Sequence, residues 1–349
     1  MPILVDLYDN RSLTAFINKI TKVDPFVYQT LFKNNKQDHN SDIIDVETIY
    51  GNEKIAQFVH SDETAPRITE KGTKKVQQVK IPKTWEAKIF TARELAEINQ
   101  IGNIYGDAVS KRNAQKEFIR LELEDLRERV IRLREKMACD AIVTGKIAAS
   151  QTNIDFEIDF NFVNGTHLIT LTNSNLWTHA DSNPTSKINE WKRLITKACN
   201  ASPTIMILGT AAADAFRANT KVGTLLDQNN TRMGALEMTG KYNVGATYIG
   251  RLYGLDCYEY MQQYVNSSGV ATDMISTDRA ILIAPTKDFR THFGPAWRIQ
   301  NNSTSEPVFG EFVVEVDHNS NNQMLQWNCE QKSLTTIHDP GCVISAKVV

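Results

Sequence analysis

The residues able to do covalent or metal chemistry are few and scattered along these 349 residues. The cysteines stand at 139, 199, 257, 329 and 342, and the seven histidines at 39, 60, 167, 179, 292, 318 and 338. No CxxC motif or Cys/His cluster occurs, so neither a disulfide framework nor a zinc site is predicted. No serine lies in a nucleophile elbow, and no carboxylate pair stands out. The sequence therefore predicts no catalytic, cofactor-binding or metal-binding residues and no enzyme, although residues that converge only in the folded chain escape such a search.

One row of carboxylates invites a metal interpretation. Asp155, Glu157 and Asp159 alternate with Ile154, Phe156, Ile158 and Phe160, so that they share one face of a predicted strand. Three carboxylates in a row are suitable ligands for a hard cation. However, no glycine-containing loop or bidentate glutamate accompanies them, and a solvent-exposed face opposite an aromatic core face is the favoured interpretation.

Two stretches resemble phosphate-binding loops without fulfilling the pattern. Gly209 joins a short apolar strand, 204–208, to a helix at 211–218, but it is a single glycine without the GxGxxG repeat. The segment Gly234 to Tyr242 has five residues instead of four before Gly240-Lys241, and Tyr242 replaces the magnesium-binding Ser or Thr. Neither segment predicts a nucleotide site.

The longest element of the chain is a helix predicted over 107–144, between Gly106 and Gly145. Its apolar residues form one stripe: Ile119, Leu123, Leu126, Val130, Leu133, Met137 and Ala141. The other face carries mixed charges: Arg112, Lys116, Arg120, Glu124, Arg127, Glu128, Arg134 and Glu135. Such a helix is roughly 50–60 Å long. It either joins a coiled coil or, as we favour, lies along its own domain with the charged face in water or against neighbouring subunits.

Two N-terminal extensions lack a core of their own. Residues 1–40 form an arm whose aromatic side chains, among them Phe16 and Phe26, need another surface to cover them. Residues 41–90 alternate in polarity on both sides of a polar tip at 61–78, which predicts a long two-stranded hairpin. The basic residues Arg67, Lys71, Lys74 and Lys75 lie in or beside this tip. Acidic residues are interspersed and no aromatic residue is available for base stacking, so contact with an acidic protein surface is favoured over nucleic acid.

The rest of the chain alternates between strand-rich and mixed segments. Asn164-Gly165 predicts a hairpin turn that returns strand 154–162 through His167–Leu171. Residues 177–300 predict an α/β module with helices at 186–199 and 211–218 and strands at 204–208, 246–252, 255–260 and 280–284. From Pro307 the chain is rich in strand again and is expected to pair with strands near 154–171. The fold class is therefore α+β.

Composition limits the environment and the partners. The net charge is −2, so no global field favours nucleic acid or an anionic membrane. The N-terminus lacks a signal-peptide pattern and no apolar run is long enough to span a bilayer, so a cytoplasmic protein with reduced thiols is expected.

This order of parts resembles the capsid fold of tailed phages typified by phage Hong Kong 97, and in particular the family of the phage lambda major head protein. The resemblance depends on the arm around Val23-Asp24-Pro25-Phe26, the helix ending at Gly145-Lys146, the strand 156–160, and the region from Glu311 to Pro340. These are motifs of shape rather than of chemistry.

The resemblance implies a structural subunit that assembles into the hexamers and pentamers of an icosahedral shell around double-stranded DNA. Residues 1–40 would be the N-terminal arm and 41–90 an extended loop overlapping an adjacent subunit. Residues 91–176 and 301–349 would form a peripheral domain and 177–300 an axial domain. The expected contacts between subunits are Phe16, Phe26, Arg67, Lys71, Lys74, Lys75, Arg127 and Arg134.

The resemblance also implies partners and a location. These partners are other copies of the chain, a portal protein, a scaffolding protein during assembly and packaged DNA held without specificity; whether a decoration protein joins them is open. The virion, assembled in the host cytoplasm, is the expected location, and no cofactor is implied. Lys71, Lys74 and Lys75 lie where some relatives form a Lys–Asn cross-link, which we do not predict here. Two alternatives stay open: a bacterial nanocompartment shell of the same fold, and a soluble α/β enzyme whose site forms only in three dimensions.

Overall fold

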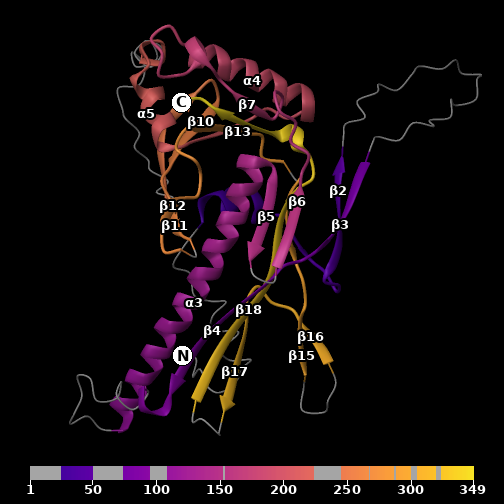
Figure 1. The fold of residues 1–349 in the computed structure, drawn as a ribbon, viewed down its shortest axis with the longest axis vertical. Coiled ribbons are helices and arrows are strands. Elements are labelled where there is room, and N and C mark those ends of the chain that lie inside the picture. Colours follow the sequence, from indigo (N-terminus) through magenta and orange to yellow (C-terminus); the bar gives the residue numbers. More distant parts are fainter. Residues whose placement is uncertain are drawn as a thin grey trace, which may run out of the picture.

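The computed structural model describes residues 25–49, 74–94, 108–151, 154–223, 245–266, 268–286, 288–299, 305–319 and 324–349. Two sheets lie at opposite ends of an elongated molecule, and the long helix α3 (Ala108–Thr144) runs from one to the other (Figure 1). The predicted α+β class and the predicted helix are both present.

The first sheet has six strands in the order β7-β19-β13-β8-β10-β9. They are β7 (Leu168–Thr170), β19 (Val343–Lys347), β13 (Arg279–Ile283), β8 (Ile205–Leu208), β10 (Leu255–Tyr260) and β9 (Ala246–Leu252). Helices α4 (Pro184–Cys199) and α5 (Thr210–Ala218) and the C-terminal half of α3 cover it. The central strands β8 and β13 are nearly continuous apolar runs because they are buried on both faces. These helices and four of these strands are the ones predicted for the α/β module.

The second sheet is built around the 14-residue strand β18 (Met324–Ile337). Its neighbours are β17 (Val313–Asn319), β14 (Phe289–Phe293) and β4 (Lys83–Thr91), and β1 (Lys36–Asp38) pairs with β14. One face of this sheet packs on the N-terminal half of α3 through Phe312, Val314, Leu325 and Trp327. A short hairpin of β15 (Ala296–Ile299) and β16 (Ser305–Val308) leads from β14 to β17.

The remaining elements are short. The π-helix η1 (Tyr28–Phe32) precedes β1, and β5 (Lys146–Gln151) pairs with β6 (Ile154–Asp159) directly after α3. Two single helical turns, η2 (Asn173–Asn175) and η3 (Pro340–Cys342), precede α4 and β19. The small hairpin of β11 (Gln263–Val265) and β12 (Ala271–Asp273) lies between β10 and β13.

The predicted hairpin is shorter than expected. Strands β2 (Ile43–Ile49) and β3 (Lys74–Lys80) pair as predicted, but the continuation through Trp85 and Ile89 does not belong to the hairpin. It is β4, which pairs with β18 over residues 83–91. Pro82 interrupts the chain between the two strands, and Phe90 on β4 contacts Trp327, which attaches β4 to the core under α3.

The predicted hairpin turn at Asn164-Gly165 is wrong. Gly165 does turn the chain with φ +85°, but β6 pairs with β5, and β7 pairs in parallel with β19. The reason lies at the end of α3, where Gly145 adopts φ +69° and a side chain there would collide with Phe162. This turn lays β5 beside β6, a pairing that the sequence pattern did not indicate.

The C-terminal strands divide between the two sheets. As expected, β19 pairs with a strand near 154–171, namely β7. In contrast, β17 pairs with β18, and β18 pairs with β4 on its other side. Strand β14 lies in the expected axial domain (177–300) but pairs with β18 of the expected peripheral domain. Strand β19 lies in the expected peripheral domain but pairs with β13 of the expected axial domain.

The long helix is buried more widely than one stripe. Leu133 of the predicted apolar face is 42% exposed, while Glu124, Arg134 and Glu135 of the predicted charged face are buried. The cause for Arg134 and Glu135 is that η1, β5 and β19 pack against the C-terminal half of α3, while Leu133 lies on the side that stays exposed to solvent. The helix lies along its own chain, as favoured over the coiled coil.

The carboxylate row on β6 is used in ion pairs. The Lys146 ammonium lies 2.7 Å from Glu157 and 3.2 Å from Asp159, and both carboxylates are exposed to solvent. This arrangement supports the solvent-face interpretation.

Candidate assembly interfaces

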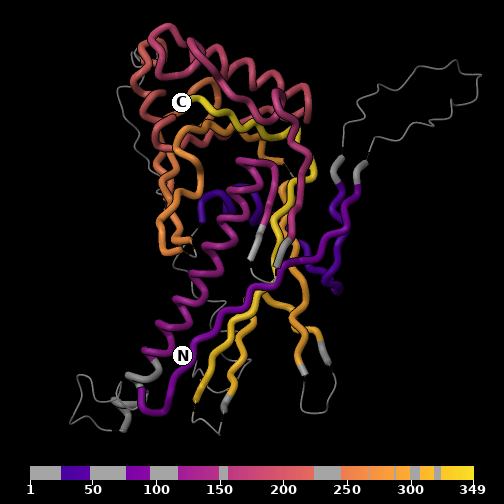
Figure 2. The backbone as a smooth tube through the Cα atoms, viewed as in Figure 1, coloured from indigo at the N-terminus to yellow at the C-terminus, as the bar shows by residue number. Residues whose placement is uncertain are grey.

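The arm is held against its own chain from Pro25 onward. Phe26 is 2% exposed, and its ring centroid lies 4.9 Å from that of Tyr258, while Phe32 packs edge-on against Phe289 at 5.4 Å. Figure 2 shows this indigo segment beside the C-terminal half of α3 before it continues to β2. The surface of Phe26 is thus covered within one subunit. Phe16 lies outside the described residues.

A buried carboxylate fixes the arm to α3. Glu135 is 1% exposed; its Oε1 accepts hydrogen bonds from the backbone N–H of Val27 at 2.9 Å and from the Tyr260 hydroxyl at 2.8 Å. Its Oε2 accepts from the N–H of Tyr28 at 2.9 Å. Burial raises the pKa of Glu135, and these hydrogen bonds oppose that rise. Through the hydrogen bonds from Val27 and Tyr28, Glu135 holds the N-terminal end of η1 against α3.

The two arginines expected between subunits contact aromatic rings of their own chain. Arg134 is 2% exposed, forms an ion pair with Glu311, and stacks 4.9 Å from the Tyr28 ring centroid. Arg127 lies 5.1 Å from the ring centroid of Phe312. Burial opposes ionisation of Glu311, but the charge of Arg134, with that of Lys36, outweighs it and holds the pKa of Glu311 below its usual value.

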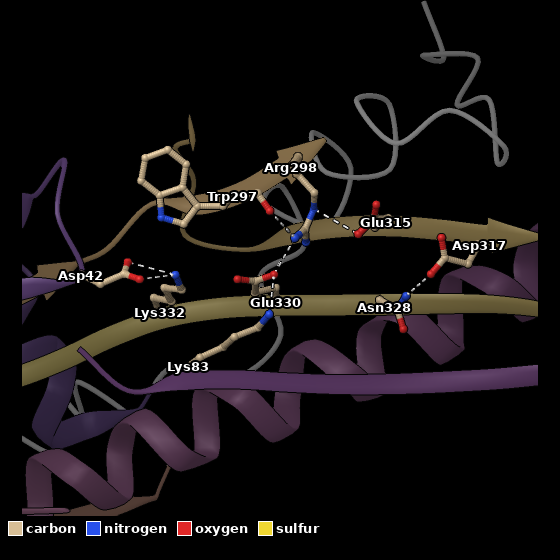
Figure 3. A network of polar contacts seen from close by, with 9 residues as sticks. All are labelled: Asp42, Lys83, Trp297, Arg298, Glu315, Asp317, Asn328, Glu330 and Lys332. Carbon is tan, nitrogen blue, oxygen red and sulfur yellow. Dashed lines mark hydrogen bonds and ion pairs between the residues drawn. The ribbon is translucent and has the colours of Figure 1, made fainter. Parts of the chain in front are cut away.

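The root of the hairpin is fixed by ion pairs on β18. Lys332 donates to both oxygens of Asp42 at 2.9 and 3.1 Å, and Asp42 directly precedes β2 (Figure 3). The carbonyl of Asp42 also accepts from the N–H of Ile81, directly after β3. Ile44, Val46 and Val79 are buried on the side of the hairpin that faces the body. The hairpin thus starts from a fixed base and projects away from the body (Figure 1).

The same face of β18 carries a buried charge network (Figure 3). Glu330 is 1% exposed and accepts from Arg298 at 2.6 Å, and Lys83 lies 3.3 Å away. Arg298 also pairs with Glu315 at 3.1 Å. The network joins β18 to β4, β15 and β17, so that long-range partners compensate the burial of Glu330. A hydrogen bond from Asn328 to Asp317 extends it.

Exposed apolar side chains border this network. Trp85 and Ile89 on β4 are 54% and 55% exposed, and Trp297 on β15 is 46% exposed. Cross-strand register places Trp85 opposite Glu330 and Ile89 opposite Gln326, on the face turned away from α3. In the part of the chain that the structure describes, β4 pairs on one side only. We call Trp85, Ile89 and Trp297 the outer apolar surface. An edge strand with such side chains is typical of a protein interface.

The basic residues predicted from the hairpin tip are described only in part. Lys74 and Lys75 lie on β3, in register with Ile49 and Thr48. Arg67 and Lys71 lie outside the described residues. Sequence reasoning missed the outer apolar surface as an interface, although the period-two pattern of β4 was visible and is one signal that could have revealed it.

No helix among the described residues is long and apolar enough to cross a membrane.

Comparisons with known proteins agree with this architecture. The family model of phage major capsid protein E matches residues 9–348. A solved structure described as a candidate prophage capsid protein of E. coli CFT073 is similar with a TM-score of 0.65 and 15% identity, covering 98% of this chain and 99% of that one. A phage-related protein from Bordetella bronchiseptica RB50 is similar with a TM-score of 0.57 and 11% identity, covering 97% of each chain. No curated protein matches the sequence significantly.

The family match covers nearly the whole chain and includes both sheets, the long helix and the hairpin. It confirms the prediction of a phage shell protein over the nanocompartment and over the soluble enzyme. The chain belongs to the phage major capsid protein E family and is a structural, non-enzymatic protein of the virion shell.

Proposed function

We propose that this chain assembles into hexamers and pentamers of an icosahedral head that encloses double-stranded DNA. The observation that carries the proposal beyond family membership is the outer apolar surface. Trp85 and Ile89 lie on an edge strand and are more than half exposed in one subunit. Covering them with a neighbouring copy would bury apolar area and pair the free edge of β4.

The projecting hairpin is the second proposed contact. Ile43 and Val76 are 51% and 54% exposed on the side of β2–β3 turned away from the body. We propose that this hairpin overlaps an adjacent subunit, with Lys74, Lys75 and the tip residues Arg67 and Lys71 facing acidic groups there. Phe16, earlier in the arm, is proposed to contact a neighbouring copy, while Phe26, Arg127 and Arg134 stabilise the subunit that makes these contacts.

The two sheets agree only in part with the expected axial domain (177–300) and peripheral domain (91–176 and 301–349), because β7 and β19 join the six-stranded sheet and β14 joins the five-stranded one. We propose that the six-stranded sheet with α4 and α5 forms the axial domain around the capsomer axis. The five-stranded sheet and the N-terminal half of α3 would form the peripheral domain. Assembly in the host cytoplasm, with a scaffolding protein and a portal, belongs to the same proposal. A net charge of −2 is consistent with DNA held without strong adhesion to the wall.

Electron microscopy of the expressed full-length chain tests the proposal. We expect head-sized shells or tubes, alone or with a co-expressed scaffolding protein. The double variant W85S/I89S should keep its circular dichroism spectrum but remain as dispersed subunits or capsomers. Leu133→Ser, which changes a 42% exposed leucine on α3, is the matched control and should assemble normally.

Three outcomes would contradict the proposal. Small uniform cages would favour a nanocompartment. A low-order oligomer that never assembles, even with a scaffolding protein, would remove the shell function. Normal assembly of W85S/I89S would show that the outer apolar surface is not an interface.

A further inference from the structure

Two cysteines far apart in the sequence meet at one end of the six-stranded sheet. Cys199 is the last residue of α4, and Cys342 is the last residue of η3, directly before β19. Both are free thiols. Cys342 is fully buried, whereas Cys199 is partly exposed. No local sequence pattern pairs them, because 142 residues lie between them.

The backbones that carry these cysteines are in close contact. A Cβ atom on Gly341 would lie 2.9 Å from the Cβ of Ala198, so the residues next to the two cysteines touch without a side chain between them. Asn200 ends α4 in a left-handed conformation with φ 53°. Asp339 accepts the N–H of Gly341 at 2.8 Å and fixes the turn before Cys342. The close contact between these two backbones is thus part of the packing between α4 and η3.

Cys199 and Cys342 each follow directly after one of these two touching residues, so the same contact brings the two cysteines to neighbouring positions. The hydrogen bond from Cys342 is the main cause that lowers the pKa of Cys199, while the same contact and burial raise the pKa of Cys342. The Cys342 thiol also donates toward Oδ2 of Asp339 at 3.6 Å, and its sulfur lies 3.5 Å from the Thr286 hydroxyl. The partly exposed sulfur is therefore the readier thiolate, and the buried thiol has a carboxylate beside it to accept its proton.

We propose that Cys199 and Cys342 form a reversible disulfide bond when the protein meets a small disulfide oxidant such as glutathione disulfide. The Cys199 thiolate attacks one sulfur of the oxidant, forms a mixed disulfide and releases one glutathione thiolate. Cys342 then loses its proton to Asp339 and attacks the Cys199 sulfur, which releases the second glutathione thiolate. Two protein thiols lose two electrons and two protons, and one glutathione disulfide becomes two molecules of glutathione.

The bond would tie α4 to the sheet that it covers. Closing so long a loop restricts the unfolded chain, and the backbones already meet in the folded chain, so a net gain in stability is expected. The reduced subunit would fold and assemble without the bond, and oxidation would then lock this end of the molecule. The inference concerns the subunit itself and does not depend on the proposed assembly contacts.

A metal ion is the competing occupant of this site. Three possible ligand atoms lie within 4.8 Å of one another, one each from Asp288, Asp339 and Cys342. Zinc accepts such a set of one thiolate and two carboxylates. That set leaves Cys199 unused, although Cys342 is the main influence on the pKa of the Cys199 thiol. The disulfide uses both sulfur atoms, and we favour it for that reason.

The test uses the full-length protein purified in EDTA and incubated in reduced or oxidised glutathione. Differential alkylation and peptide mass spectrometry should find a Cys199–Cys342 linked peptide only after oxidation, about 2 Da lighter than the sum of the two reduced peptides. The unfolding temperature should rise by several degrees and return on reduction. Cys199→Ser should abolish both effects, while Cys257→Ser, which changes a buried thiol on β10 in the same sheet, should retain them.

Other outcomes would overturn the proposal. Full alkylation of both cysteines after oxidation, or glutathione retained on Cys199 alone, would show that the second step does not occur. Protection of Cys342 by added Zn²⁺, together with no linked peptide in metal-free oxidised protein, would assign the site to a metal instead. The wild-type measurements decide between these results even if a variant folds poorly.

Discussion

The two sheets bury their central strands by opposite means. In the six-stranded sheet, Ile281, Leu282 and Ile283 of β13 are fully buried among other apolar side chains. In the five-stranded sheet, Asn328 and Glu330 of β18 are buried to the same degree but are polar. The first sheet needs only apolar cover, whereas the second needs partners at particular positions, because an unpaired buried charge costs several kcal/mol.

This contrast distinguishes the sheet that stabilises the subunit from the sheet that we propose takes part in assembly. The apolar sheet is covered by α4 and α5 and can fold as a body of its own chain. The polar network of the other sheet positions β4, β15 and the root of the hairpin, the elements that carry the exposed apolar side chains (Figure 3). Substitutions in the two sheets should therefore differ in their dependence on partners and on pH.

Removing one partner of the buried ion pair should have the largest effect. Arg298→Met leaves Glu330 with Lys83 alone, and we expect a loss of about 4 kcal/mol in the free energy of unfolding. Urea unfolding followed by circular dichroism measures it. The double variant R298M/E330L should recover most of the loss. A double variant as unstable as the single one would show that the charge network is not the cause.

A cavity in the apolar sheet should cost somewhat less and should not be rescued by any single partner. Leu282→Ala on β13 is expected to lose about 3 kcal/mol by the same measurement. The loss should be equal at pH 7 and pH 5, because no titratable group is involved. A pH-dependent loss would contradict the purely apolar account of this sheet.

The five-stranded sheet should weaken in acid through His292 on β14. Its Nδ1 lies 2.8 Å from Nε2 of His39, and its Nε2 lies 2.9 Å from the Thr336 hydroxyl, which lies 3.2 Å from Nε2 of His338. Burial, with the nearby His39, His338 and Arg290, lowers the pKa of His292 to about 3. The unfolded chain thus binds this proton more readily, and the stabilisation present above pH 6.5 is lost as the pH falls toward about 3.

The measurement for His292 compares unfolding free energies across this range. Wild type should lose about 2 kcal/mol between pH 6.5 and about pH 5 from this residue, and His292→Gln should flatten that slope. A smaller dependence of the unfolding free energy on pH should remain in H292Q, because burial also lowers the pKa values of His39 and His338. Asp38 near His39, and Glu47 and Asp288 near His338, reduce this remaining dependence because they favour the protonated rings. An unchanged slope in H292Q would remove His292 as the acid-sensitive group.

The anchor of the arm should respond to pH in the opposite direction. Burial raises the pKa of Glu135, so its contribution is complete below 4.5 and is lost as the pH rises through the folded-state pKa. Glu135→Gln should cost about 1–2 kcal/mol in acid because it replaces one acceptor oxygen by a donor. The difference in unfolding free energy between E135Q and wild type should become smaller as the pH rises. Proteolysis or hydrogen exchange at Val27 and Tyr28 measures release of the arm from α3. A difference in unfolding free energy between wild type and E135Q that grows as the pH rises would contradict this account of Glu135.

The exposed ion pairs of β5 and β6 should matter least. Lys146→Ala removes contacts to Glu157 and Asp159 at the surface, and we expect the smallest change in unfolding temperature among these variants, because water and salt screen exposed ion pairs. Thermal unfolding in low and high salt measures it. A fall in unfolding temperature as large as that of Leu282→Ala would mean that these side chains contribute more than solvent-exposed pairs usually do.

The amino-acid sequence determined the elements whose residues carry their own pattern. The apolar period of Ile119–Ala141 specified the long helix, and the apolar runs at 204–208 and 280–284 specified central strands, because burial on a fixed face imposes a local periodicity. The order of these elements was enough for a resemblance to phage capsid proteins, which the family model bears out.

Only the tertiary structure decided which elements meet. Glu135, Arg134 and Glu330 look like solvent-facing charges in the sequence, and each is buried because its partner comes from a distant segment. The pairing of β4 with β18 and the contact of Ala198 with Gly341, next to Cys199 and Cys342, arise in the same way. Local pattern records how a residue is solvated along its own element, whereas strand pairing and the pairing of buried polar groups depend on the packing of the whole chain.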